Sequence, residues 1–328
     1  MGACWVCCRR ANGHVKLSMT ATSGRDDSYQ PYQGEELGRT SDQPSTSKNN
    51  SDMTMKLLLG SKNLRRKRIP YENLTLEGPS LSEEVSVYEY NGQKVAARKL
   101  PQSEQDAKRI EAFAEEIELN ASLVHPNIVQ FIGVAWRDLS DLALVREFLP
   151  KGSLRAYLQA NMEQSWTEEK TRIALGIAQA LEYLHGCRPT VIHGDIKANS
   201  VLLTEDLEPK LIEIGSRGTT TGGKMSFWTA PEVLEGKQLT QQADIYSFGV
   251  LLTELDTGKG PYSDTMTKTG IKLQPSQVLQ LVKTGKLRPH LSKNCPLRIQ
   301  RLGAACLAHN PLNRPSARQL VRQLESRD

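Results

Sequence analysis

The residues that could carry out chemistry are concentrated in one short segment of the chain. Between two apolar runs, alternate positions carry polar side chains, namely His193, Asp195 and Lys197. Ser200 ends this polar segment. A second carboxylate, Glu213, follows 18 residues after Asp195. Carboxylates can accept a proton in general base catalysis, and they are among the oxygen ligands that Mg²⁺ prefers. These two stretches are therefore the first place to look for a site.

Residues 191–203 resemble the catalytic loop of protein kinases, which reads H-R-D-L-K-x-x-N between short apolar strands. In register, Asp195 and Lys197 are retained, whereas Ser200 replaces the metal-binding Asn. Glu213 opens the triplet Glu-Ile-Gly where the family has the metal-binding D-F-G. The resemblance implies that Asp195 and Lys197 occupy catalytic positions, retained here as vestiges. No metal is expected at Ser200 and Glu213, because Mg²⁺ tolerates little distortion of its octahedron.

Other kinase segments follow in order between residues 74 and 326. They are Val95-Ala96-Ala97-Arg98 for V-A-x-K, Glu116 for the glutamate of helix αC, Trp228-Thr229-Ala230-Pro231-Glu232 for A-P-E, Asp244–Gly249 for the central helix, and Asn313-Arg314-Pro315 for the Arg that pairs with the A-P-E Glu. Their style resembles the tyrosine-kinase-like group of Ser/Thr kinases. The resemblance implies an α+β, two-lobed protein-kinase-like fold, with a small β-rich N-lobe and a larger, mainly α-helical C-lobe.

The resemblance also implies a nucleotide cleft, but this chain departs from the family pattern at several of its positions. The corresponding residues are Gly78, Val85, Ala96, Arg98, Glu116 and Glu147. Only the first glycine of the Gly-rich loop remains, and Glu83 takes the place of the third. A carboxylate about 5 Å from a phosphate charge costs roughly 3 kcal/mol at an effective dielectric constant near 20, unless Glu83 points into solvent. Arg98 replaces the strand Lys, and its planar fork does not occupy the place of a compact ammonium.

Arg146 stands at the back of the expected cleft, where the family usually has an apolar or small residue. Buried arginine is rare unless it is paired. One hypothesis is an ionic cluster in the place of Mg·ATP, with the members Arg98, Arg146, Glu116, Glu213 and, as a further candidate, Glu83. The alternative is that Arg146 extends along its aliphatic stem toward solvent. Asn120, one turn beyond Glu116, places a polar residue where the family has an apolar one.

Two functions fit these residues. The first is a degenerate member of the family, a pseudokinase that acts as a signalling scaffold or allosteric regulator with impaired or absent phosphoryl transfer and without a cofactor. The second is a weak or atypical Ser/Thr kinase that transfers the γ-phosphate of ATP to proteins, using Asp195 with Glu213 as a makeshift Mg²⁺ ligand. Loss of both metal ligands, the Gly-rich loop and the strand Lys favours the first function. The expected partners are signalling proteins and not nucleic acid, because a net charge of +5 is small.

The elements that would position these residues can be predicted from local patterns. Strands are predicted near residues 74–76, 85–88, 95–97 and 142–145. Asn91-Gly92 is the signature of a two-residue hairpin turn. Residues 104–122 have helical spacing of apolar side chains, and Ser165-x-x-Glu168 is a capping-box signature at the start of a longer helix.

Composition divides the chain into a tail and a domain. Residues 1–68 are expected to form a disordered tail, because most of this segment is too polar to offset its chain entropy by burial. The kinase-like domain is expected over residues 69–328, with an N-lobe over about 69–148 and a C-lobe over about 149–328. The basic cluster Lys62–Arg68 could be a solvated linker, a membrane-surface contact or a nuclear import signal.

The first ten residues resemble an N-terminal lipidation pattern. The candidate acylation sites are Gly2, Cys4, Cys7 and Cys8. Val6 departs from the myristoylation motif, which requires Ser or Thr, so a reactive-thiol tail is an alternative, and a metal site with His14 is a weaker one. No apolar run is long enough to span a bilayer. The expected location is therefore the cytoplasm, with attachment to the inner membrane leaflet if the tail is acylated.

Overall fold

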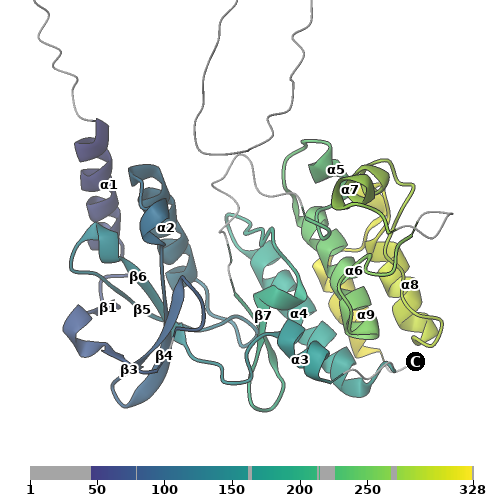
Figure 1. Cartoon of the computed structure of the whole chain (residues 1–328), viewed down its shortest axis with the longest axis horizontal. Helices are drawn as coiled ribbons and strands as arrows, with labels where there is room; N and C mark the ends of the chain where they lie inside the picture. Colours follow the sequence, from purple (N-terminus) through teal and green to yellow (C-terminus); the bar gives the residue numbers. More distant parts are fainter. Residues whose placement is uncertain are drawn as a thin grey trace, which may run out of the picture. The chain divides into compact units, whose positions relative to one another are not determined.

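The computed structural model describes residues 46–78, 80–161, 165–212, 214, 226–266 and 272–326. These residues form a mixed α+β fold with a sheet-rich N-lobe and a helical C-lobe, as predicted (Figure 1). Within the described residues, no helix combines the length and the apolar character needed to cross a bilayer.

The N-lobe is built on a six-stranded sheet with the order β1-β5-β6-β4-β3-β2. Its strands are β1 (Arg68–Ile69), β2 (Thr75–Leu76), β3 (Val85–Tyr90), β4 (Gln93–Lys99), β5 (Phe131–Ala135) and β6 (Ala143–Glu147). The predicted hairpin joins β3 to β4, and Asn91 and Gly92 both have left-handed backbones with φ values of 51° and 76°. These angles match the twist that a two-residue turn requires, so the Asn-Gly signature is confirmed.

Two helices accompany this sheet, α1 (Thr46–Gly60) and α2 (Ala107–Ser122), and they pack side by side (Figure 1). Helix α2 confirms the helix expected over residues 104–122, although it begins at Ala107, after the short 3-10 turn η2 (Gln102–Glu104). Asp106 caps α2 by accepting a hydrogen bond from the Arg109 backbone N–H at 3.0 Å. The short 3-10 turns η1 (Tyr71–Asn73) and η3 (Leu139–Asp141) complete the lobe.

The expected beginning of the ordered domain at residue 69 is wrong. Leu58 of α1 and Leu64 in the following turn are 2% and 1% exposed, and they join a core with Phe113 and Ile117 of α2. The polar composition of the segment suggested a disordered chain, but a few apolar residues are enough once α2 offers a partner surface. Residues 1–45, which include the four candidate acylation sites, lie outside the described part of the chain.

The C-lobe is organised around α4 (Glu168–Gly186) and α6 (Gln241–Thr257). Its remaining elements are α3 (Leu154–Ala160), η4 (Ala198–Ser200), β7 (Val201–Leu203), β8 (Pro209–Leu211), α5 (Pro231–Leu234), α7 (Pro275–Lys283), α8 (Leu297–Cys306), η5 (Pro311–Asn313) and α9 (Ala317–Glu325). Apolar side chains of α4, such as Ile177 and Leu181, pack with Phe248 of α6 in one buried core. The most apolar helix, α6, therefore lies at the centre of the lobe.

The predicted capping box of α4 is wrong by two residues. Thr167, not Ser165, caps the helix, because its side chain accepts a hydrogen bond from the Lys170 backbone N–H at 3.2 Å. Glu168 is consequently the first helical residue, where its negative charge favours the positive end of the helix dipole.

Candidate functional site

The segment with Asp195 is held in place by one carboxylate from α6. Asp244 accepts hydrogen bonds from the backbone N–H groups of His193 at 2.9 Å and Gly194 at 2.8 Å, and it lies 2.9 Å from Nε2 of His185. Gly194 adopts φ = 80°, a conformation that glycine reaches without strain. Since Asp244 is only 1% exposed, its bonds to the loop are shielded from water, and the loop is fixed to the core of the C-lobe.

Asp195 and Lys197 face one another within this loop. The Lys197 ammonium forms an ion pair with Oδ2 of Asp195, whose side chain is nearly buried. The Asp195 backbone N–H also donates to Nδ1 of His193 at 3.2 Å. A carboxylate held beside a cation in this way can orient and accept a proton from a hydroxyl group. The structure thus brings the two predicted catalytic positions together.

Ser200 uses its hydroxyl group to close its own turn. The oxygen accepts a hydrogen bond from the Lys197 backbone N–H at 3.1 Å, and the hydroxyl lies 2.7 Å from the Asp195 carbonyl and 2.9 Å from the Lys197 carbonyl. Ser200 is 0% exposed. A buried hydroxyl engaged with three backbone groups does not fit a Mg²⁺ ligand, which must leave its oxygen open to the ion.

The other predicted metal-ligand position, Glu213, lies outside the described residues. Within the described part, no group of three or more His, Cys, Asp or Glu side chains is arranged to hold a metal ion. The candidate site consists of the loop around Asp195 and the N-lobe strands.

Arg98 lies at the centre of an ionic group in the N-lobe. Its guanidinium forms ion pairs with Oε1 of Glu116 and, at 3.2 Å, with Oε2 of Glu84, and it stacks over the Phe113 ring at 4.7 Å from the ring centroid. Burial alone would lower the pKa of Arg98, but the carboxylates of Glu116 and Glu84 outweigh it and raise the pKa. With both ends of its fork occupied, Arg98 has little freedom to grip a phosphate.

The predicted ionic cluster agrees with the structure in one ion pair and differs from it in one carboxylate. The pair Arg98–Glu116 is confirmed, whereas the second carboxylate on Arg98 comes from Glu84 and not from Glu83. Glu83 is exposed, which agrees with the solvent-facing alternative. Arg146 is only 6% exposed, so the alternative in which its side chain extends to solvent is wrong. Since Glu213 is outside the described residues, the predicted role of Glu213 in this cluster stays a hypothesis.

The loop at the position of the Gly-rich loop folds back on itself. The backbone N–H groups of Leu81 and Ser82 both donate to the Val85 carbonyl, at 2.8 and 3.1 Å, and Oγ of Ser80 lies 2.8 Å from Oγ of Ser86. Backbone N–H groups engaged in this way are not available to cradle phosphate oxygens. Gly78, which is the retained first glycine of this loop, has a left-handed backbone with φ = 79°.

The remaining predicted cleft residues lie on the paired strands. In the sheet, Val85 is opposite Arg98, and Ala96 is paired with both Val87 and Arg146. Glu147 is at the end of β6, where one carboxylate oxygen accepts from the Gln130 backbone N–H at 2.6 Å and from the Lys210 ammonium at 2.7 Å. The carboxylate of Glu147 therefore links the sheet to β8.

Asn120 joins α2 to the segment near Glu213. Its amide nitrogen donates to the Glu116 carbonyl at 2.7 Å and lies 3.4 Å from the Ile214 carbonyl. The side chain is 6% exposed, so these contacts lie in a region that water does not reach. A polar link therefore stands where the family has an apolar contact, as the sequence suggested.

Glu254 is a functional candidate that the sequence predictions missed. It lies on α6 at 0% exposure, accepts from the Ala198 backbone N–H at 3.0 Å and from Nε1 of Trp228 at 2.7 Å, and has Arg155 at 3.9 Å. Burial raises the pKa of Glu254 to about 7. The available signal was a single carboxylate within the apolar run of residues 248–255. By contrast, the predicted pair Glu232–Arg314 is confirmed as a buried bidentate contact at 2.6 and 2.7 Å.

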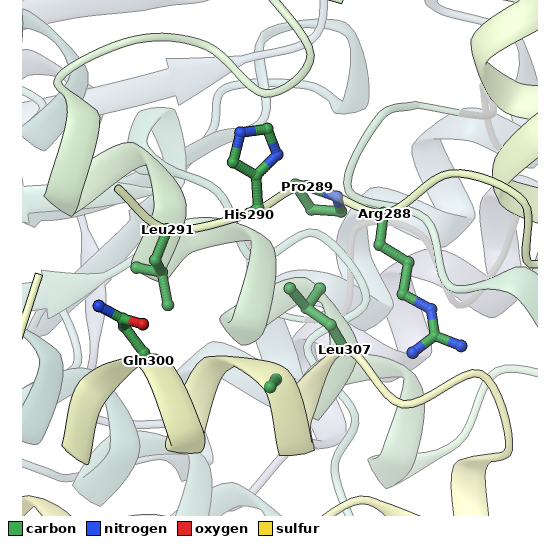
Figure 2. A pocket seen from close by; sticks show the side chains of 7 residues that line it. Arg288, Pro289, His290, Leu291, Gln300 and Leu307 are labelled. Atoms are coloured by element: carbon green, nitrogen blue, oxygen red, sulfur yellow. The ribbon is translucent and has the colours of Figure 1, made fainter. Parts of the chain in front are cut away.

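A separate cavity of about 260 Å³ lies in the C-lobe, between the segment 288–291 and α8. Figure 2 shows Arg288, His290 and Gln300 around it, with the apolar side chains of Leu291 and Leu307. The Gln300 amide is engaged with the Cys295 carbonyl at 2.7 Å. The lining has no carboxylate, so this cavity offers no counterpart to the acid–base arrangement around Asp195.

The comparisons with known proteins agree with this arrangement. The model of the family described as protein tyrosine and serine/threonine kinase matches residues 82–324. One relative, the probable serine/threonine-protein kinase drkB of Dictyostelium discoideum, is 33% identical over 74% of this chain and 35% of its own length. The serine/threonine/tyrosine-protein kinase HT1 of Arabidopsis thaliana is 32% identical over 74% of this chain and 62% of its own length.

The name of a third relative describes it as inactive. It is a probable inactive receptor kinase of Arabidopsis thaliana, 31% identical over 65% of this chain and 35% of its own length. The chain therefore spans between about a third and just under two thirds of the lengths of these three relatives.

Proposed function

We propose that this chain, which belongs to the protein tyrosine and serine/threonine kinase family, is a pseudokinase. In this role it would act as a signalling scaffold or allosteric regulator. The observation that carries the proposal is the Ser200 hydroxyl, which is fully buried and bonded within its own turn. Phosphoryl transfer depends on metal ions that neutralise the phosphates. A chain whose side-chain oxygen at this ligand position is already bonded to its own backbone holds such an ion poorly.

Arg98 supports the same proposal through charge. Two carboxylates already neutralise its guanidinium, and Leu81 and Ser82 direct their N–H groups to Val85. The Glu116 pair corresponds to one that active kinases also keep, but the Glu84 contact and the two bonds to Val85 would have to be displaced before the phosphates gained contacts of their own. This cost falls on binding itself, so both nucleotide affinity and transfer are expected to be low.

The test is a thermal-shift titration of the full chain with ATP, in the absence and presence of Mg²⁺ or Mn²⁺, together with a phosphate-transfer assay. We expect no metal-dependent rise in Tm at millimolar nucleotide and no transfer. The double variant Ser200→Asn with Glu213→Asp restores both family ligands, and the companion variant Asp195→Asn removes the proton acceptor. Metal-dependent transfer by the unmodified chain that disappears in Asp195→Asn would overturn the pseudokinase proposal.

The second candidate, a weak or atypical Ser/Thr protein kinase, is favoured by one observation. Asp195 and Lys197 keep their ion pair in a loop that Asp244 fixes to the core. In that case ATP and Mg²⁺ would supply the phosphate and its charge neutralisation, and Asp195 would hold the proton of the attacking hydroxyl. All three relatives above are named as kinases, and the name of one describes it as inactive, so both candidates have a counterpart among similar proteins.

The partners that we propose are signalling proteins, which a catalytically silent kinase domain can bind through its lobes. The tail is proposed to attach the chain to the inner membrane leaflet through Gly2, Cys4, Cys7 or Cys8. Mass spectrometry of the protein isolated from its native cells measures this directly, since each acyl chain adds a defined mass to the N-terminal peptide.

A further inference from the structure

We propose that the folded N-lobe carries a binding face for anionic lipid headgroups, separate from the tail. Its charged part is the segment Lys62–Arg68, here called the basic turn, which contains Lys62, Arg65, Arg66, Lys67 and Arg68. Its apolar part is the outward side of α1. This face goes beyond the pseudokinase proposal, because it requires neither a nucleotide nor a protein partner.

The basic turn is a fixed part of the N-lobe. Leu64 in its middle is 1% exposed within the core beneath α1 and α2. The Lys67 backbone N–H donates to the Leu64 carbonyl at 2.8 Å, and the Lys67 carbonyl accepts from Val134 of β5 at 2.9 Å. The Arg68 guanidinium stacks over the Trp136 ring at 4.3 Å. The cations are therefore presented from an ordered backbone, which lowers the entropy lost when they bind a surface together.

The charges of the basic turn are available to an external partner. All five cationic side chains are exposed. Among the residues that the structure describes, none of Lys62, Arg65, Arg66 and Lys67 forms an ion pair. The carboxylate that reaches this segment, Glu118 of α2, instead accepts hydrogen bonds from Ser61 and, at 2.8 Å, from Asn63. Neutral donors thus occupy this carboxylate, and within the described part of the chain no cation of the basic turn is paired with it.

The outward side of α1, which ends just before the basic turn, adds exposed apolar side chains. Met53 and Leu59 are 59% and 56% exposed, and Lys56 between them is also exposed. Helical spacing places these three residues on the side of α1 away from Leu58, which packs inward. Exposed apolar side chains next to several cations are typical of a surface that lies at the bilayer interface.

A bilayer fits this combination better than a nucleic acid does. Phosphate groups of either partner would attract the cations, but the apolar side chains of Met53 and Leu59 have no counterpart on a phosphate backbone. Acyl chains at the headgroup boundary can cover them. A single acyl group binds membranes only marginally, so a basic face would also supply the second signal that an acylated tail needs for stable attachment.

The test is cosedimentation of the full chain, produced unacylated in bacteria, with vesicles of phosphatidylcholine containing about a third phosphatidylserine. Each cation near an anionic surface contributes about fivefold to binding, so the triple variant Lys62→Gln, Arg65→Gln, Arg66→Gln should bind roughly 100-fold more weakly. Binding should also fall when salt is raised from about 0.1 M, since screening shortens the reach of the charges. The three side chains are exposed, so the Tm should not change.

Two matched triple variants remove the same net charge elsewhere. One changes Lys286, Lys293 and Arg301 of the C-lobe to Gln, and all three of these residues are exposed. The other changes Arg9, Arg10 and Lys16 of the tail to Gln. We expect both to retain most of the binding to vesicles. If the C-lobe variant lost as much binding to vesicles as the basic-turn variant, the effect would be one of net charge. If the tail variant lost more binding than the basic-turn variant, the binding would belong to the tail. Either result overturns the proposal.

The competing class of partner is tested at the same salt concentration. A single-stranded RNA oligonucleotide, with binding followed by fluorescence anisotropy, should bind more weakly than the vesicles. Leu59→Ser should weaken binding to vesicles without altering its dependence on salt. Tighter binding to RNA than to vesicles would also overturn the lipid face.

Discussion

At the scale of single residues, three departures from the family pattern, Ser200, Asn120 and Arg98, are each held by named partners. Ser200 bonds to the backbone of its own turn, and Asn120 reaches two carbonyls. Arg98 pairs with Glu116 and Glu84. Buried polar groups are costly when unpaired, so such replacements persist only together with their partners. Restoring a single family residue is therefore expected to lose contacts before it gains any function.

The pair Arg98–Glu116 gives a prediction for stability. Glu116→Gln removes the charge that neutralises the buried guanidinium but keeps the size of the side chain. Breaking one side of a buried ion pair is strongly destabilising, and since Glu84 remains nearby, we expect a loss of about 2 kcal/mol. Urea denaturation measures this change.

Glu115→Gln is the matched control for that variant. Glu115 is the exposed neighbour of Glu116 on α2 and should change the free energy of unfolding by less than about 0.5 kcal/mol. Equal effects of the two substitutions would contradict the importance assigned to the Arg98 pair.

At the scale of elements, α1 is the addition that the local sequence did not predict. It lies along α2 (Figure 1). Leu58 of α1 is buried in a core that it shares with α2, the helix that carries Glu116 and Asn120. Ser61 and Asn63, just after α1, bond to Glu118 of the same helix. Helix α2 is thus supported from its outer side, which favours one fixed position of α2 in the N-lobe.

Neighbouring leucines of α1 test this packing directly. Leu58→Ala leaves a cavity between α1 and α2 and should cost about 3 kcal/mol of stability. Leu59→Ala, one residue further on an exposed side, should cost less than about 0.5 kcal/mol. Thermal unfolding of the two variants decides the matter, and a similar Tm for both would mean that α1 contributes little to the fold.

At the scale of the whole molecule, Glu254 connects parts that are far apart in the sequence. Its carboxylate bonds the loop of Asp195 through Ala198 and the A-P-E segment through Trp228, with Arg155 of α3 nearby. Asp244 on the same helix holds His193 and Gly194. Helix α6 therefore holds the loop of Asp195 in place, and it does so through Asp244 and Glu254.

The raised pKa of Glu254 makes stability depend on pH. Its ordinary pKa is 4.5, and burial raises it to about 7 in the folded chain. Below about pH 4.5 both states are protonated, and the stabilising effect is complete. Between these two values only the unfolded state releases the proton, so stability falls as pH rises, by on the order of 3 kcal/mol in total.

Glu254→Gln isolates this effect, because an amide keeps an acceptor oxygen for Ala198 and Trp228 but does not titrate. The Tm of the variant minus that of the unmodified chain should increase from pH 5 to pH 8. Other titrating groups are common to both proteins and cancel in the difference. A difference that stayed constant over this range would show that Glu254 is already ionised in the folded chain at low pH.

The sequence by itself determined the order of the parts and the identity of the altered site. The hairpin at Asn91-Gly92, helix α2, the pair Glu232–Arg314 and the positions of Asp195 and Lys197 all follow from short motifs. The hairpin and α2 depend on turn geometry and apolar periodicity, which are local properties of the chain. The pair Glu232–Arg314, the positions of Asp195 and Lys197 and the two-lobed fold were implied by the resemblance to the kinase family.

Only the tertiary structure decided which partner each altered residue finds. Glu84 rather than Glu83 meets Arg98, the Ser200 hydroxyl turns into its loop, and Leu58 orders α1. These outcomes depend on which side chains are brought together in space, and adjacent residues on an extended chain point to opposite sides. A motif fixes the kind of group at a position, whereas packing fixes the direction in which that group can act.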